Sequence, residues 1–134
     1  MIRRVIGIGL AALVTVGCSK AFTPETVAGI WVLRHVNGTN PPFEYMDGNT
    51  TVRITSGVIN LLEDQTFAFT LEVFIDDGTS TTSESQEVSG TYVLIDPDQI
   101  TFTDSEDGSM FSAVLSGANI TAVTDGLTLQ FERV

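Results

Sequence analysis

Short segments in which apolar and polar residues alternate run along most of this chain, and clusters of glycine, aspartate and asparagine separate them. In the clearest segment, residues 66–75, every second residue is large and apolar: Phe67, Phe69, Leu71, Val73 and Ile75. Alternation with a period of two puts one face of a strand into a core and the other into solvent. No segment shows a sustained helical period. The sequence therefore predicts an all-β protein.

Eight such segments are counted if residues 79–95 form one bent strand. They are residues 29–37, 50–62, 66–75, 79–95, 99–103, 109–115, 119–124 and 127–134. Tight turn sequences such as Asp125-Gly126 join most neighbours, so segments adjacent in the sequence are expected to pair in space. An even number of hairpin-linked strands favours a single antiparallel up-and-down β-barrel, closed by its first and last strands. The barrel domain is assigned to residues 28–134.

Two places depart from simple alternation. Residues 38–49 contain Pro41-Pro42, and proline cannot donate to a strand ladder. This segment is expected to be a loop across one end of the barrel, acting as a lid on the core or as a gate for a ligand. In the second strand the apolar phase slips at Ser56-Gly57, which predicts a β-bulge there.

The first 17 residues have the form of a secretory leader. Arg3 and Arg4 give a positive start, residues 5–16 are mostly apolar, and Gly17-Cys18 supplies a small-residue cleavage site. The apolar run is too short to span a bilayer, which takes roughly 20 residues. We expect this leader to be removed and residues 18–27 to tether the barrel.

The segment Val14-Thr15-Val16-Gly17-Cys18 resembles the lipobox of bacterial lipoproteins. The resemblance implies that the peptidase cuts before Cys18, that the Cys18 thiol carries a diacylglycerol, and that the new amine is usually acylated too. Two or three acyl chains hold a protein stably on a membrane. Because Ser19 rather than aspartate follows, the resemblance also implies the outer membrane of the bacterial envelope, facing the periplasm. The alternative is a plain signal peptide with an incidental cysteine.

A second resemblance lies in the barrel. Gly29-Ile30-Trp31 near its start, Ser89-Gly90-Thr91-Tyr92 later on and Arg133 at its end are similar to the pattern of small bacterial lipocalin-like lipoproteins. In lipocalins the tryptophan sits at the closed end of the barrel and a basic residue of the last strand packs across it. The resemblance therefore implies a structural pair, Trp31 and Arg133, that closes the barrel.

Charge argues against a polyanionic partner. Without the leader, four basic residues remain against 17 acidic ones, a formal net charge of −13. Such a surface repels phosphate backbones, so we expect no nucleic-acid binding.

The sequence offers little for catalysis or metal binding. The single cysteine excludes an internal disulfide, and His35 is the only histidine, so no transition-metal cluster is expected. No Gly-x-Ser-x-Gly motif occurs. His35 has the parity of Trp31 and Leu33 and is expected near the open end of the barrel. The acidic turn at residues 104–108 lacks the spacing of a calcium loop. The protein is therefore predicted to be non-enzymatic, without metal or cofactor.

Two hypotheses for function remain open. In the first, the barrel binds a small apolar molecule or lipid in a cavity lined by Phe67, Phe69, Tyr92 and Phe102. In the second, the barrel has a solid core and acts as a structural or protein-interaction module of the envelope. The second hypothesis predicts an exposed apolar patch around Phe74 and residues 43–46. A protein partner is not indicated by any motif.

Overall fold

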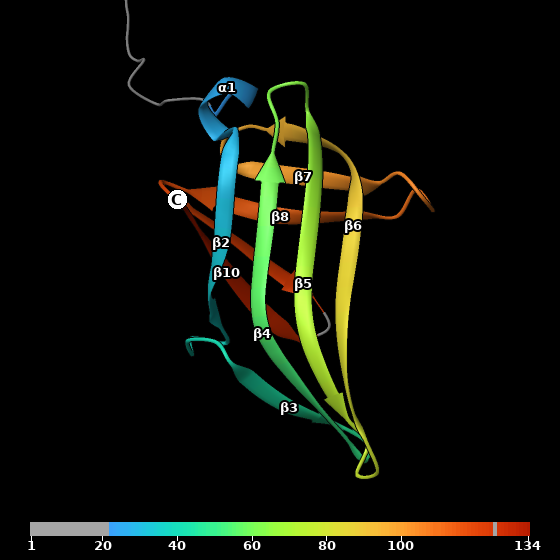
Figure 1. Ribbon diagram of the computed structural model, residues 1–134. Helices are drawn as coiled ribbons and strands as arrows, with labels where there is room; N and C mark the ends of the chain where they lie inside the picture. Colours follow the sequence, from blue (N-terminus) through green and yellow to red (C-terminus); the bar gives the residue numbers. More distant parts are fainter. Residues whose placement is uncertain (1–21, 125) are drawn as a thin grey trace, which may run out of the picture.

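The computed structural model describes residues 22–124 and 126–134 (Figure 1). The predicted leader, Cys18 and the first part of the tether lie outside the described residues. One short helix precedes nine strands. In chain order they are α1 (Pro24–Val27), β2 (Gly29–Val36), β3 (Phe43–Asp47), β4 (Thr50–Leu61), β5 (Thr66–Asp76), β6 (Thr81–Ile95), β7 (Gln99–Asp104), β8 (Met110–Ser116), β9 (Asn119–Thr124) and β10 (Leu127–Arg133).

Eight of these strands form a closed antiparallel barrel in the order β2-β10-β9-β8-β7-β6-β5-β4, and β4 returns to pair with β2. Arg133 of β10 lies opposite Trp31 of β2, and Gly29 of β2 lies opposite Leu61 of β4. From β4 to β10 each strand pairs with its neighbour in the sequence. The prediction of a single, lipocalin-like barrel of eight strands is confirmed, and its first and last strands lie side by side.

The loop predicted for residues 38–49 is partly wrong, because β3 lies within it. β3 pairs antiparallel with the first half of β4, with Phe43 opposite Ile54 and Asp47 opposite Thr50. Gly48, with φ of 65°, makes the tight turn between the two strands. Pro41-Pro42 lies before the strand, so the N–H groups that the prolines lack remove no hydrogen bond from the β3–β4 ladder. The segment is therefore a ninth strand outside the ring.

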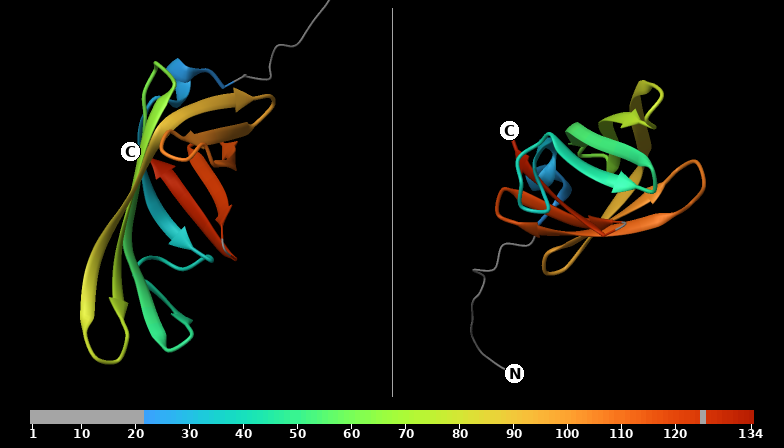
Figure 2. Two further views of the ribbon diagram at one scale, coloured as in Figure 1. Left: turned by 90° about the vertical axis from the view of Figure 1, so that its right-hand side faces the viewer. Right: turned by 90° about the horizontal axis from the view of Figure 1, so that it is seen from below.

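Four strands continue past the barrel as a twisted extension. The β5–β6 hairpin remains paired down to Asp76 opposite Thr81, and β3 and β4 run beside it. Figure 2 shows this extension projecting beyond the end of the barrel that lies away from α1. Phe43, Val52 and Ile75 on its inner face pack against the core. The extension therefore lengthens one side of the barrel wall.

Two bulges decide which residues reach the core. The register of β4 against β5 shifts between Ile54 and Ser56, just before the predicted position. In β2 a shift against β10 brings Val36, fully buried, into the core in place of His35. The parity expected for His35 is therefore wrong. An extra residue in one strand reverses the alternation beyond it.

Gly90 allows β6 to approach β7 very closely. A Cβ atom at Gly90 would lie 1.9 Å from the carbonyl oxygen of Thr103. From Gly90 to Ile95, β6 pairs with β7, whereas from Ser89 back to Thr81 it pairs with β5 alone. β6 thus separates from β7 at Gly90, and this separation leaves an opening in the barrel wall between the two strands.

The end of the barrel beside α1 is closed by Trp31. Its side chain is 1% exposed, and the indole Nε1 donates to the Val27 carbonyl at 2.9 Å. The Arg133 guanidinium lies 5.7 Å from the centre of the Trp31 ring and donates to the carbonyls of Thr26 and Ala28. Helix α1, Trp31 and Arg133 therefore close this end of the barrel together. The two side chains donate hydrogen bonds to backbone carbonyls in and beside α1, and a cation–π contact joins them to each other.

Candidate functional site: an apolar cavity in the barrel

A cavity of about 300 Å³ lies inside the barrel and extends from Ile59, opposite Trp31 of β2, to Thr124, opposite Leu127 at the end of β10 away from α1. Its lining comes from β4 to β10 and is almost wholly apolar: Ile59, Phe67, Phe69, Val88, Phe102, Ser109, Met110, Phe111, Ala113, Ile120, Ala122, Val123, Thr124, Leu129 and Phe131. Val88, Met110 and Thr124 mark its mouth, where β6 has left β7. Along β10, Leu127 lies at this end and Arg133 at the closed end, about 20 Å away at strand spacing.

Aromatic rings form the deep wall of the cavity. Phe67 and Phe102 meet edge to face with ring centres 4.8 Å apart, and Phe111 stacks on Phe102 at the same distance. Phe69 meets Phe131 edge to face at 5.9 Å. Phe67 and Phe102 are buried, whereas Phe111 is 37% exposed. Phe111 therefore joins the buried wall to the mouth.

Three of the four predicted lining residues, Phe67, Phe69 and Phe102, lie in the cavity, and Tyr92 does not. The Tyr92 side chain is buried toward the closed end, where its hydroxyl donates to the Leu62 carbonyl at 2.6 Å. Burial raises the pKa of this phenol, and the carboxylates of Asp64 and Glu63 raise it further. Tyr92 lies opposite Phe102 in the β6–β7 ladder, but its hydroxyl points to the Leu62 carbonyl and not into the cavity.

The residues at the mouth were not foreseen. Val88 lies in the middle of β6, Ser109 and Met110 lie where β8 begins, and Thr124 is the last residue of β9. Alternation predicts which face a residue occupies, but the strand ends that meet depend on the stagger of the barrel. The sequence offered one usable signal, Gly90, since an interior glycine often marks a bend or a close approach of two backbones.

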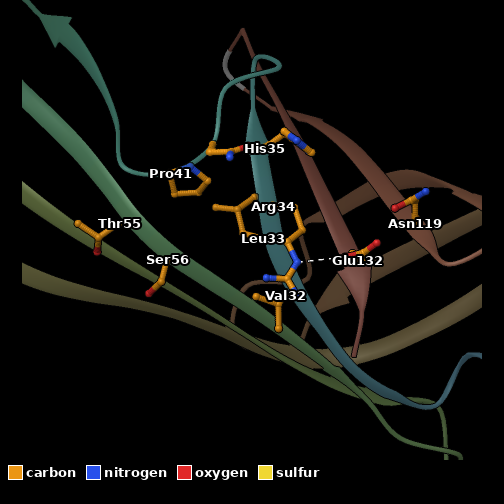
Figure 3. Close-up of a pocket in the computed structure, with 10 residues that line it drawn as sticks. Val32, Leu33, Arg34, His35, Pro41, Thr55, Ser56, Asn119 and Glu132 are labelled. Carbon is orange, nitrogen blue, oxygen red and sulfur yellow. Dashed lines mark hydrogen bonds and ion pairs between the residues drawn. The ribbon is translucent and has the colours of Figure 1, made fainter.

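A second, wider depression of about 550 Å³ lies on the outside of the barrel (Figure 3). It forms where β2 and β4 part beyond the Val32–Val58 pair, and Pro41, Thr55 and Ser56 line its other side. On β2, Arg34 donates through Nε to Glu132 at 3.1 Å, and both side chains are half exposed. The depression is open to solvent, its lining is mixed polar and apolar, and the Arg34–Glu132 ion pair in its wall is already formed.

His35 also borders this depression, and its Nδ1 is buried without a hydrogen-bond partner. No serine or acidic side chain forms a hydrogen bond with this imidazole in the described residues, so the geometry builds no nucleophile–base pair. Within residues 22–124 and 126–134, no group of three or more His, Cys, Asp or Glu side chains could hold a metal ion. Nor is any helix of this part long and apolar enough to cross a membrane.

Comparison with known proteins adds no relative. No protein-family model, no curated protein and no solved structure matches this chain significantly. The term lipocalin-like therefore describes the architecture of the barrel alone. The cavity and the sequence before the barrel are the two features that bear on function.

Proposed function

We propose that this protein is a non-enzymatic, lipid-anchored component of the bacterial cell envelope that binds a small apolar ligand inside its barrel. The observation that supports the proposal is the apolar cavity with a mouth at one end. An apolar space of this kind holds ordered water poorly, because water needs two to four polar partners. A ligand that covers the phenylalanine wall would gain the contacts that water cannot make.

The size of the cavity limits the ligand. A volume of about 300 Å³ lies at the lower end of the range for small-molecule sites, roughly 300–1,000 Å³. It is about twice the 150 Å³ apolar cavity that accommodates benzene, so a ligand of about 12 non-hydrogen atoms would fill it. A medium-length alkyl chain or a bicyclic ring meets this limit, whereas a whole phospholipid would leave most of its chains outside.

The proposed anchor would fix the direction in which the mouth faces. The described chain begins at Phe22, next to α1 at the closed end (Figure 1). Five residues from Cys18 to Phe22 reach at most about 18 Å when extended. Acyl chains on Cys18 would therefore hold the closed end against the membrane. The mouth would then open away from that membrane, toward the periplasm.

Filling the cavity is expected to abolish binding. Ala122 lines the cavity, and Ala122→Phe would place a ring in the space that the ligand needs. Calorimetric titration of a soluble Cys18→Ser mature chain with 1-decanol should show one site, and Ala122→Phe should weaken binding at least tenfold. Ala118→Phe, in the exposed turn before β9, is the matched control and should bind normally. Flat titrations of the unsubstituted barrel with decanol and with 1-naphthalenemethanol would refute the ligand proposal.

A second candidate function has an observation of its own. The outward positions of β7, β8 and β9 carry no charged side chain, although the protein is strongly acidic. Val114 on this face and Val93 on the adjoining strand β6 are about half exposed. Uncharged outer faces of this kind are typical of interaction surfaces. The patch predicted around Phe74 and residues 43–46 is smaller, because Phe43 packs on the core and leaves Tyr45, Met46 and Phe74 as its exposed members.

The ligand titrations, together with cross-linking, distinguish ligand binding in the cavity from protein interaction through the outer face. If the barrel works through its outer face, ligands should not bind, and Val114→Glu should reduce cross-links to envelope proteins. If it works through its cavity, Val114→Glu should leave decanol binding unchanged.

A further inference from the structure

The polar groups of the cavity lie only at its mouth. Among its lining residues, Ser109 and Thr124 alone carry hydroxyls; Ser109 immediately precedes β8, and Thr124 is the last residue of β9. The deep wall offers phenylalanine, leucine, isoleucine and alanine. A bound amphiphile would therefore point its alkyl part inward and leave its head group beside Ser109.

One lip of this mouth is acidic. The turn between β7 and β8 carries Asp104, Glu106 and Asp107. Asp107 accepts a hydrogen bond from the backbone N–H of Ser109 at 2.9 Å, so its carboxylate adjoins a lining residue. The hydrogen bonds from Ser109 also lower the pKa of Asp107, which keeps this group ionised at neutral pH. Asp104 joins the same turn through its backbone N–H, which donates to the Ser109 carbonyl at 2.8 Å.

The opposite lip is acidic too. Val88 of β6 borders the mouth, and Glu84 lies four residues along the same face of the strand. The side chain of Glu87 is exposed on the other face of β6. These carboxylates stand within about 15 Å of the mouth at strand spacing.

Among the described residues, no positive side chain balances these carboxylates. The three arginines of the described residues are engaged elsewhere: Arg34 with Glu132, Arg53 with Glu44, and Arg133 with carbonyls of the closed end. None of the three lines the cavity. An anionic head group at the mouth would therefore face several carboxylates with no cation to pair with, whereas an ammonium would be attracted.

From this arrangement we infer that the cavity selects cationic and neutral amphiphiles with a medium-length alkyl or aryl group and rejects anionic ones such as fatty acids. The inference rests on the proposed ligand-binding function. The apolar wall supplies affinity for all of these ligands, and the negative charge at the mouth discriminates between their head groups. Interactions between exposed charges are screened beyond about 8 Å at physiological ionic strength and beyond about 30 Å at 0.01 M. The preference should therefore be largest at low salt.

Three ligands with the same ten-carbon chain test the inference: decylamine, 1-decanol and decanoate. At pH 7 and 10 mM salt we expect decylamine to bind about tenfold more tightly than decanoate, with decanol between them. At 0.5 M salt the ratio should fall to about twofold. Glu106→Lys should bring the low-salt ratio below about threefold, whereas Glu25→Lys, on α1 at the closed end, should leave it unchanged.

The outcomes distinguish the inference from the proposed function. Decanoate binding as tightly as decylamine at low salt, while decanol also binds, would overturn the inference and leave the function standing. Failure of all three ligands to bind would overturn both. Decylamine binding that persists in Ala122→Phe would show attraction to the acidic surface rather than entry into the cavity, and would also overturn the inference.

Discussion

Replacing Trp31 with alanine should lower the free energy of unfolding by about 3–5 kcal/mol, as expected for a fully buried tryptophan. Trp31 is 1% exposed, donates to the Val27 carbonyl and lies against the Arg133 guanidinium. Its loss would leave a hole where α1 meets the barrel and would leave the Val27 carbonyl without its donor. Urea unfolding of the soluble mature chain, followed by far-ultraviolet circular dichroism, measures the change without relying on tryptophan fluorescence.

Trp31→Phe is the matched control. Phenylalanine keeps most of the buried ring but has no indole N–H, so a smaller loss of about 1–2 kcal/mol is expected. Arg133→Met should also cost less than Trp31→Ala, because it keeps an apolar stem over the ring. A loss below about 1 kcal/mol for Trp31→Ala would show that the closed end does not depend on this residue.

Replacing Cys18 with serine should release the protein from the membrane. Under the proposal, the acyl chains on Cys18 are the anchor, and each buried methylene contributes about 0.8 kcal/mol to membrane binding. A serine at this position cannot carry the thioether-linked diacylglycerol. We expect the unsubstituted protein in the membrane fraction, labelled by a palmitate analogue. The Cys18→Ser protein should be soluble or retained as an unprocessed precursor, without label.

Ser19→Ala keeps the cysteine and should remain labelled and membrane-bound. The Cys18→Ser protein, once freed of its leader, should show the same β-rich circular dichroism as the native barrel, since Cys18 precedes the described fold. A mature chain that begins with an unmodified thiol, as measured by mass spectrometry, would contradict the anchor.

Local pattern predicted the strands well. The segment 66–75 became β5, and its five alternating apolar residues all belong to the core or pack against it. The single bent strand predicted for residues 79–95 is β6, Thr81–Ile95. The exposed Phe74 was also foreseen. In each case the alternation of the side chains decides which face is buried, and that rule needs only neighbours in the sequence.

The failures share a different cause. Pro41-Pro42 predicts a loop over residues 38–49, yet β3 begins after the prolines and pairs with β4. His35 was assigned to the wrong face because the bulge in β2 became visible only in its register with β10. Tyr92 was placed in the cavity by parity alone. In all three the partner strand supplied the deciding information.

Local patterns in the sequence account for the β character of the chain, the number of barrel strands, the pairing of its ends and the features that suggest a lipid anchor. Period-two alternation, turn residues and a short leader are all local signals. The existence of a cavity, its opening away from α1 and the acidic side chains that flank its mouth are properties of the folded barrel. Those properties depend on the stagger between strands and on how completely side chains from seven strands fill a common space, and no local pattern records either quantity.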